Sequence, residues 1–441
     1  MVRLTGAFSR LNTRKILVIG DLMLDTYTIG KARRISPEAP VAVIQVAREE
    51  RRPGGSGNVV LNLKSLGAEV VVIGRIGPDA SGELLRSSLA EENVDVQGLF
   101  VQQGFVTPLK NRIIADNQQV VRVDYEQVVP LPEMLEQQII EALPRLLKDV
   151  AAVAISDYGK GFLSRTLLSA IIEQAKIHKI PVITDPKGND FTKYSGSTII
   201  KPNLSEAYAA AGLLPDASLD LAAHKILQLA NAEMLMITRS EAGISVFHRN
   251  GERHDFPVKV REIKDVTGAG DTVLAMLTYA ISNGLGITES THLSNIAAGM
   301  AIERFGCARI SLSELARRLL DTDVGSKVFD TEHLFALHEA LKGMKYVLLS
   351  LTGGDGMTSS IFSAIHKLAK DSEKALVVYL RDAQPEADFV NLLASIRDVK
   401  FIVIQSKDLI DICGLIPPEE IYAVVDTKLV TVATTKDLLL C

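Results

Sequence analysis

The segment with the clearest chemical potential is a glycine-containing turn that ends in an acidic residue. It reads Asp265-Val-Thr-Gly-Ala-Gly-Asp271 and is followed by an apolar stretch with helical spacing, Leu274–Ile281. At the N-terminus of such a helix, the amides of Gly268–Gly270 can bind anionic oxygens. Asp271 would then accept the proton of an attacking hydroxyl while these amides hold the phosphoryl group. The alternative is a plain turn in which Asp271 only caps the helix.

Polar residues that suit a sugar precede this segment in the chain. Asp21 and Asp25 follow the apolar run Lys15–Gly20, at the edge where open α/β sheets bind ligands. Two carboxylates there suit hydrogen bonds to sugar hydroxyls, although each could equally be a turn or cap residue. The run Pro53-Gly-Gly-Ser-Gly-Asn58 permits close approach of a ligand, and the Asn58 amide can both donate to and accept from a hydroxyl.

A third polar segment follows the apolar run Thr198–Ile200. In Lys201-Pro-Asn-Leu-Ser-Glu206, Asn203 would cap a helix that begins at Leu204, and Glu206 would complete a capping box. The functional alternative is that Glu206 orients Mg²⁺ and its waters near a triphosphate, and both roles can hold together. The sequence contains neither GxxxxGK[ST] nor GxGxxG with a following acidic residue, which argues against P-loop and dinucleotide-binding proteins.

The elements that must position these residues alternate between short apolar runs and stretches of helical spacing. Runs typical of strands recur at Val70–Ile73, Ala151–Ile155, Val182–Thr184, Thr198–Ile200 and Met234–Thr238. Helical spacing occurs, for example, at Leu163–Ala175 and Leu219–Leu229. This alternation over roughly 300 residues predicts an α/β fold with a parallel sheet wrapped by helices.

Two segments instead alternate apolar and polar residues, as half-exposed strands do. They are Val41–Val46 and Gln118–Tyr125, and they predict a small β-sheet outside the main layer that could act as a lid. Pairing with a second subunit would cover its open edge, so a homodimer is expected.

The α/β alternation restarts after Asp321-Thr-Asp-Val-Gly-Ser326. It predicts a helix near Thr331–Leu341, a strand at Tyr346–Leu351, a helix from Ser359, and strands at Ala375–Leu380 and Phe401–Ile404. We therefore expect two domains, residues 1–322 and a smaller Rossmann-like domain at 323–441.

Composition excludes several classes of function. A formal charge of −5 over 441 residues leaves no basic face for nucleic acid, so small molecules and copies of the chain are the expected partners. The three cysteines, Cys307, Cys413 and Cys441, lie far apart without a CxxC pair, which fits a reducing cytosol and argues against a structural metal. No apolar run is long enough for a bilayer, and the N-terminus lacks the apolar core of a secretory signal. A cytoplasmic protein is expected.

Taken together, the two glycine motifs, the Asn-x-x-Glu motif and their order resemble the ribokinase, or PfkB, family of carbohydrate kinases over roughly residues 12–320. Within that family the sequence is more similar to heptose 7-phosphate kinases. The segments that carry this closer resemblance are Gly20–Asp25, Arg34–Pro40, Asn117–Gln119 with Arg122 and Asp124, Ser156–Gly161 and Asp185–Gly188. The resemblance implies a ribokinase-like sandwich with a small β-sheet lid.

It also implies a reaction and a set of site residues. ATP, with Mg²⁺ and room for a monovalent cation, would phosphorylate the C1 hydroxyl of D-glycero-D-manno-heptose 7-phosphate for ADP-heptose and lipopolysaccharide core synthesis. By the family pattern, the base is Asp271, and the anion hole consists of Gly268, Ala269 and Gly270. The nucleotide and magnesium residues are Asn203, Leu204, Ser205, Glu206, Thr238, Arg239, Gly243 and Asn295. The sugar residues are Asp21, Asp25, Gly54, Gly55 and Asn58.

A substrate that already bears a phosphate needs cations. The expected candidates for the 7-phosphate are Arg34, Lys110, Arg112 and Lys187. Exposure to solvent is the usual alternative for such side chains.

The C-terminal part resembles the nucleotidyltransferase domain of bifunctional relatives in layout. Val328–Leu334 resembles the helix that leads into that domain, and Tyr346–Asp355 resembles its first strand and nucleotide loop. The HisXGlyHis sequence of such transferases is absent, because Gly356–Ile361 contains no histidine. We expect an inactive domain retained for structure, dimerisation or regulation, although Gly353-Gly354 could still cradle a phosphate.

Two alternatives to the heptose kinase stay open at this point. One is a kinase of the same fold for another sugar, sugar phosphate or nucleoside, because few side chains decide substrate choice. The other is a non-catalytic binding or scaffold protein.

Overall fold

The computed structural model describes residues 8, 10–116, 118–258, 263–304, 306–322, 327–329, 334–352, 356–370, 373–406, 408–425, 428–435 and 437–439. The chain forms two compact units, and each is described by itself. The main unit is Asn12–Ile310, and the second unit joins Met1–Leu11 to Ser311–Cys441. Asn117 and Gly353-Gly354, which the sequence analysis singled out, lie outside the described residues.

The division between the units lies after Ile310, whereas the boundary expected from the sequence lies after residue 322. The reason is helix α10 (Leu312–Thr322), which packs on α11 (Leu334–Leu341) in the second unit. Ser313 Oγ donates to Glu339 Oε2 over 3.0 Å, and Arg317 Nε donates to the Ala340 carbonyl over 3.2 Å.

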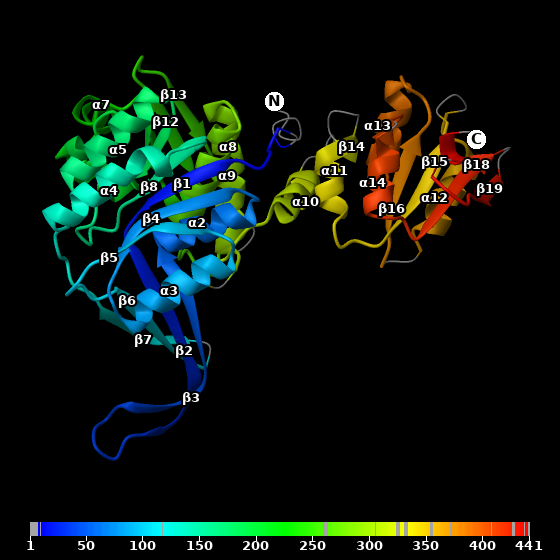
Figure 1. The fold of residues 1–441 in the computed structure, drawn as a ribbon. Coiled ribbons are helices and arrows are strands. Elements are labelled where there is room, and N and C mark those ends of the chain that lie inside the picture. The colour runs from blue at the N-terminus through cyan, green and yellow to red at the C-terminus, as the bar shows by residue number, and fades with distance from the viewer. Residues whose placement is uncertain are drawn as a thin grey trace. The chain divides into compact units, whose positions relative to one another are not determined.

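The apolar runs of the main unit form a nine-stranded sheet in the order β13-β12-β11-β10-β9-β8-β1-β4-β5 (Figure 1). All neighbours from β11 to β5 are parallel, and β12 and β13 add an antiparallel edge. The strands are β1 (Lys15–Gly20), β4 (Glu69–Ile76), β5 (Asp95–Val101), β8 (Ala152–Ser156), β9 (Val182–Asp185), β10 (Ile199–Ile200), β11 (Met234–Thr238), β12 (Ile244–His248) and β13 (Arg253–Phe256).

Helices cover both faces of this sheet, because alternate residues of its strands point to opposite sides. Leu17 and Ile19 of β1 belong to the apolar core formed with α4 (Glu133–Leu146), α5 (Arg165–Ile177), α6 (Leu204–Ala211) and α7 (Leu219–Leu229). On the other face, α2 (Ser56–Ser65) and α8 (Ala269–Ser282) contact β1, and α9 (Ile287–Ile302) packs on α8. Helix α3 (Ala80–Glu91) packs along β5, and short 3-10 helices lie at Phe191–Tyr194 and Ser240–Ala242.

A separate four-stranded sheet, the lid sheet, has the order β3-β2-β6-β7. Its strands are β2 (Leu22–Ile35), β3 (Ala42–Gly55), β6 (Leu109–Ala115) and β7 (Gln118–Tyr125). Figure 1 shows the β2–β3 hairpin reaching well past β6 and β7. The expected small sheet is therefore present, and its hairpin exposes Ile35 and Val46 at 73% and 55%.

The second unit contains a six-stranded sheet, β14-β17-β16-β15-β18-β19, parallel except for the β18–β19 pair. Its strands are β14 (Val328–Phe329), β15 (Tyr346–Leu351), β16 (Ala375–Leu380), β17 (Val399–Ile404), β18 (Glu420–Val425) and β19 (Lys428–Thr431). Its further helices are α12 (Ser359–Leu368), α13 (Ala387–Ser395), α14 (Leu409–Leu415) and the 3-10 turn Asp437–Leu439.

One local expectation for the second unit is wrong. Val328 and Phe329 do not begin a helix but form β14, because both are apolar and pair with β17 at the sheet edge. The Phe329 ring packs edge-on against Phe401, with centroids 5.7 Å apart. In the described part of the chain, no helix is both long and apolar enough to cross a membrane.

Candidate active site

Helix α8 begins at the glycine turn that the sequence analysis singled out. Gly268 is the N-cap residue and has a φ of +78°, a left-handed conformation that favours glycine. A Cβ atom there would lie 2.8 Å from Asn58 Nδ2, so the turn also needs the space. The Ala269 amide donates to the Val266 carbonyl over 3.2 Å. The Ala269 amide is therefore engaged within the turn, whereas the Gly270 amide of the expected anion hole lies in the first turn of the helix, where an anion can bind.

Asp271 lies in this first turn with its carboxylate held from two sides. Asn58 Nδ2 donates to Oδ2 over 2.7 Å, and the Tyr158 hydroxyl donates to Oδ1 over 2.5 Å. Burial raises the pKa of Asp271, whereas the hydrogen bonds from Asn58 and Tyr158 and the charge of Lys201 lower it. The carboxylate is thus oriented for a proton acceptor and is stabilised in its ionised form by its neighbours.

Tyr158 also connects Asp271 to Asp21. The amides of Tyr158 and Lys160 each donate to Asp21 Oδ2 over 3.0 Å. Burial of Asp21 raises its pKa, and these two backbone hydrogen bonds oppose that effect. Two carboxylates from distant parts of the sequence are therefore held by one short loop, which follows β8.

A cavity of about 180 Å³ lies beside Asp271, at the carboxyl ends of β8–β11. Its lining includes the expected residues Lys187, Asn203, Glu206, Thr238, Gly268, Gly270 and Asp271. It also includes Asp157, Tyr158, Asp185, Pro186 and Lys201, to which the sequence analysis gave no role.

The capping box expected on the nucleotide side is present. Asn203 Oδ1 accepts from the Glu206 amide over 2.9 Å, and Glu206 Oε2 accepts from the Asn203 amide over 3.1 Å. Ser205 Oγ donates to Asn203 Oδ1, and the Leu204 side chain is partly exposed at 37%. The second oxygen of Glu206, Oε1, accepts from Lys187 Nζ over 2.7 Å. The cap thus uses only one carboxylate oxygen of Glu206. The other oxygen pairs with Lys187, and both residues line the cavity.

Lys201 is the most buried cation of the cavity, with 2% of its surface exposed. Its Nζ lies 2.9 Å from Asp185 Oδ2, and a Cβ atom built on Gly270 would lie 3.8 Å from the same Nζ. Burial raises the pKa of Asp185 to about 6 even though Lys201 lowers it. A lysine so placed can stabilise negative charge that develops beside Asp271. Its sequence signal was its position directly after a buried strand, at the edge that binds ligands in α/β sheets.

On the sugar side, the two expected glycines let backbone approach the carboxylates closely. A Cβ atom on Gly54 would lie 2.1 Å from Asp25 Oδ2, and one on Gly55 would lie 2.6 Å from the Asp21 carbonyl. Asp25 belongs to β2 rather than to a turn after β1, and its Oδ1 lies 2.6 Å from Arg112 Nη1. The turn and cap alternatives for Asp25 are therefore wrong.

Residues 13–314 match the pfkB family of carbohydrate kinases. The chain belongs to this family. The matched segment corresponds to the main unit except at its ends. The protein is accordingly an enzyme, a sugar kinase of a family that uses ATP.

Curated relatives of this kinase resemble it over most of its length. The bifunctional protein HldE of Trichlorobacter lovleyi is 40% identical over 403 residues, which cover 89% of this chain and 79% of that protein. The bifunctional protein HldE of Geobacter metallireducens is 40% identical over 418 residues, which cover 89% of this chain and 84% of that protein.

Solved structures share the fold of the kinase at low sequence identity. The ribokinase of Arabidopsis thaliana complexed with ribose and ATP superposes with a TM-score of 0.56 at 16% identity, covering 70% of this chain and 99% of that one. The tetrameric inhibited form of phosphofructokinase-2 from Escherichia coli gives a TM-score of 0.57 at 20% identity, covering 70% and 98%. These similarities confirm the predicted ribokinase-like fold.

Several expected nucleotide residues of the kinase do not line the cavity at Asp271. They gather instead around the end of β13. Gly243 has a φ of +82°, and a Cβ atom there would lie 2.1 Å from the Phe256 carbonyl. Asn295 Nδ2 donates to the carbonyls of Phe256 and Pro257 over 3.3 and 3.0 Å. Arg239 pairs with Asp255 over 3.3 Å.

Arg34 does not reach the cavity within one chain. It lies near the tip of the β2–β3 hairpin, opposite Val43 and exposed to solvent. Asp25 lies nine positions earlier in the same extended strand, which corresponds to about 30 Å. Arg34 is therefore wrong as a phosphate ligand for the site of its own chain.

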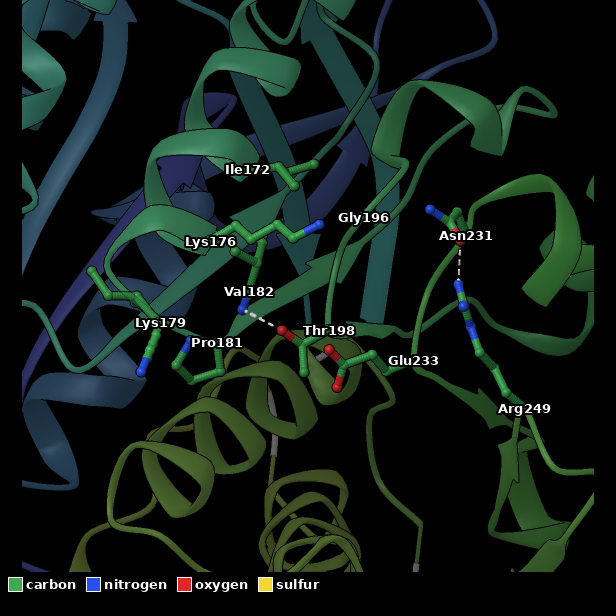
Figure 2. A pocket seen from close by; sticks show the side chains of 11 residues that line it. Ile172, Lys176, Lys179, Pro181, Val182, Gly196, Thr198, Asn231, Glu233 and Arg249 are labelled. Carbon is green, nitrogen blue, oxygen red and sulfur yellow. Dashed lines mark hydrogen bonds between the residues drawn. The ribbon is translucent and has the colours of Figure 1, made fainter.

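A larger cavity, about 440 Å³, lies at the opposite edge of the main sheet, where β9–β11 begin (Figure 2). It contains none of the expected site residues. Lys176 and Lys179 line it near the C-terminus of α5, where cations complement the helix dipole. Ligands of open α/β sheets bind at the carboxyl ends of strands, so the smaller cavity is the better candidate for the active site of the kinase.

The donor set around the cavity suits a hard cation bound through water more than a directly ligated metal. Among the described residues, no group of three or more His, Cys, Asp or Glu side chains could hold a metal ion. Glu206 and Asp185 nevertheless both line the cavity, and carboxylates paired with phosphate oxygens are the usual environment of Mg²⁺.

Removing the Tyr158 hydroxyl should shift the acid limb of the pH–rate profile to higher pH. If Asp271 is the base, it must be ionised, and the hydrogen bond from Tyr158 lowers the pKa of Asp271 against the effect of burial. In Tyr158→Phe this pKa rises, so activity is lost earlier as the pH falls and recovers toward alkaline pH. Measurements of kcat across pH test this.

The matched control is Tyr194→Phe, because Tyr194 is also buried and its hydroxyl donates to Asp157 over 2.7 Å. In Tyr194→Phe, the acid limb of the pH–rate profile should stay at the wild-type pH. A loss of rate in Tyr158→Phe that is equal at every pH would show a structural role only.

Proposed function

We propose that the kinase transfers the γ-phosphoryl group of ATP to the C1 hydroxyl of D-glycero-D-manno-heptose 7-phosphate, giving the 1,7-bisphosphate for ADP-heptose and lipopolysaccharide core synthesis. The observation that carries the chemistry is the buried Asp271 carboxylate, fixed by Asn58 and Tyr158 at the N-terminus of α8. The 40% identity to proteins named HldE supports this sugar over the other substrates of the family.

In this proposal each residue of the site has a separate task. Asp271 accepts the proton of the attacking hydroxyl. The first-turn amides of α8 and the Lys201 ammonium stabilise charge on the phosphoryl group in flight. Asp21 and Asn58 orient the sugar, because both are buried next to the base: Asp21 accepts from the Tyr158 amide, and Asn58 donates to Asp271 itself.

The nucleotide side would hold ATP with Mg²⁺. Glu206 and Asn203 form the rim that faces the triphosphate, with Glu206 binding the ion through water. When bound there, Mg²⁺ would neutralise part of the negative charge of the triphosphate. The same proposal places the kinase in the cytoplasm and includes the possibility of a monovalent cation that accompanies ATP.

A homodimer is also part of the proposal. Its support is the exposed apolar surface of the β2–β3 hairpin, where Ile35, Val41 and Val46 are 73%, 57% and 55% exposed. A second copy that covers this hairpin would remove a long exposed strand edge.

We propose that the second unit is a degenerate nucleotidyltransferase. The segment where such enzymes carry two histidines instead begins α12, with Thr358 Oγ1 accepting from the Ile361 amide over 3.2 Å. A hydroxyl cap cannot supply the positive charge of two imidazoles beside an α-phosphate. The histidine of α12, His366, is exposed at 68% of its side chain and lies 3.8 Å from Asp398.

One assay tests these assignments together. Purified protein is supplied with Mg²⁺-ATP and one acceptor at a time: heptose 7-phosphate, heptose 1-phosphate, fructose 6-phosphate, ribose and a nucleoside. The expected result is preferred phosphorylation of heptose 7-phosphate at C1, without formation of ADP-heptose from heptose 1-phosphate. Preference for another acceptor would refute the substrate, phosphorylation of none would favour a binding protein, and ADP-heptose formation would refute the inactive second unit.

A further inference from the structure

Two lysines, one from the lid sheet and one from a loop of the main unit, meet at one carboxylate beside the proposed sugar site. Lys160 Nζ lies 2.7 Å from Glu126 Oε1, and Lys110 Nζ lies 3.9 Å from Glu126 Oε2. Both lysine side chains are mostly buried, at 12% and 18% exposure, which is rare for this residue type. Glu126 follows β7 of the lid sheet, whereas Lys160 belongs to the loop after β8 of the main sheet.

This lysine pair is tied to residues of the sugar site. The Lys160 amide donates to Asp21 Oδ2, so the backbone of Lys160 is fixed beside that carboxylate. Lys110 lies opposite Asp25 in the β2–β6 register. Because alternate residues of β6 share a face, Lys110 lies on the same side as Arg112, which pairs with Asp25. That side of the lid sheet faces the catalytic edge, since Asp25 Oδ2 lies beside Gly54, and the turn at Gly54 leads to Asn58, which donates to Asp271.

The cluster is incompletely satisfied by its own residues. The two ammonium groups pair directly with one carboxylate, because the neighbouring carboxylates Asp25 and Asp124 are paired with Arg112 and Arg122. One positive charge of this group therefore remains in a largely buried place, which is unfavourable. Glu126 Oε2 is itself buried without a hydrogen-bond partner. A phosphate group carries about −1.5 to −2 charges at neutral pH and three acceptor oxygens, which balances two ammonium groups better than a carboxylate does.

The other expected phosphate ligands are already engaged or remote. Arg112 is held by Asp25 over 2.6 Å, and Lys187 is held by Glu206 over 2.7 Å on the nucleotide side. Arg34 lies near the tip of the hairpin. Of the four cations expected from the sequence, only Lys110 lies on the sugar side without a close ion pair.

We propose that Lys110 and Lys160 bind the phosphate that the sugar carries away from its reacting hydroxyl, and that this phosphate displaces the Glu126 carboxylate. The inference rests on the proposed function, because it needs a substrate that is already phosphorylated. It adds a residue, Lys160, that the sequence analysis did not select. Lys160 would contact both ends of the sugar site, through its amide on Asp21 and its ammonium on the phosphate.

The test compares phosphorylated and unphosphorylated heptose as acceptors for the full-length enzyme. In Lys110→Met and Lys160→Met, the ratio of kcat/KM for heptose 7-phosphate to that for heptose should fall at least ~10-fold, the scale of one hydrogen bond to a charged group. In Glu126→Gln, KM for heptose 7-phosphate should fall, because no carboxylate competes for the lysines. Lys176→Met, at the opposite edge of the sheet, is the matched control and should leave the ratio unchanged.

The outcomes separate this inference from the proposed function. If the wild-type enzyme phosphorylates no phosphorylated sugar, both fail. If it uses heptose 7-phosphate but neither lysine variant changes the ratio, only this inference fails. A rise of KM in Glu126→Gln similar to that in Lys160→Met would show that the Lys160–Glu126 contact is a structural ion pair, and would overturn the inference even if Lys160→Met folds poorly.

Discussion

Asp271→Asn should lower kcat by at least ~10²-fold, the usual scale for loss of a general base, with little change in ATP binding. The amide has nearly the shape of the carboxylate and can keep the contact with Asn58 through its oxygen. It cannot accept a proton from the sugar hydroxyl. Because burial raises the pKa of Asp271, removing this charge should not destabilise the fold, so thermal melting should occur at or above the wild-type temperature.

The measurements are steady-state phosphoryl transfer and calorimetric titration with ATP. Asp220→Asn serves as the control, because it alters a carboxylate of the same unit that is 60% exposed and does not line the cavity. It should retain wild-type turnover. If Asp271→Asn keeps wild-type turnover as well, Asp271 is not the base, and the turn at Gly268 would be structural.

The fold followed from the sequence where periodicity and burial agreed. The predicted bounds of β11, β15, β16 and α7 match the structure, because each is a buried apolar run or an amphipathic run. The predicted bounds of β7 match as well, although this strand is almost wholly exposed. Strand β2 was not foreseen, since Leu22–Ile35 mixes apolar and polar residues without a clear period. Strand β2 forms because β3 and β6 pair with it on both sides, and this pairing cannot be read from the residues of β2 alone.

The site could be predicted only as separate pieces. Asp271, Asn58 and Glu206 were identifiable because local glycine and capping patterns mark them. Tyr158 was not, because its role depends on strand order. Strand β8 lies next to β1 in the sheet, so the loop after β8 meets the acidic residue after β1, although these strands are distant in sequence. No local pattern in the chain encodes that adjacency.

The same reasoning explains why Arg34 was misplaced. The run Arg34–Pro40 is distinctive in composition, but the length of the β2–β3 hairpin determines where it lies. Strand length in a hairpin depends on pairing across both strands and on the turn that joins them, which residue types at the tip do not reveal.

Lys201→Met should lower kcat by ~10²–10³-fold, the scale for removing one group that stabilises transition-state charge. The Lys201 ammonium is almost fully buried beside the first turn of α8, where the phosphoryl group would pass. A buried charge in such a place interacts more strongly than one in water, and it requires no reorganisation during the reaction. Methionine keeps the length and apolar contacts of the stem but removes the charge.

Lys201→Met also removes the ion pair with Asp185, and this effect must be separated from the loss of charge stabilisation on the phosphoryl group. Lys201 pairs with Asp185 over 2.9 Å, so its loss leaves a buried carboxylate without its cation. The double variant Asp185→Asn with Lys201→Met removes both charges and restores the balance of the pocket. If Lys201 acts on the phosphoryl group, the double variant should melt like the wild type yet remain as slow as Lys201→Met. Recovery of kcat in the double variant would instead mean that Lys201 only neutralises Asp185, and the amides of α8 would then have to stabilise the transferred group without it.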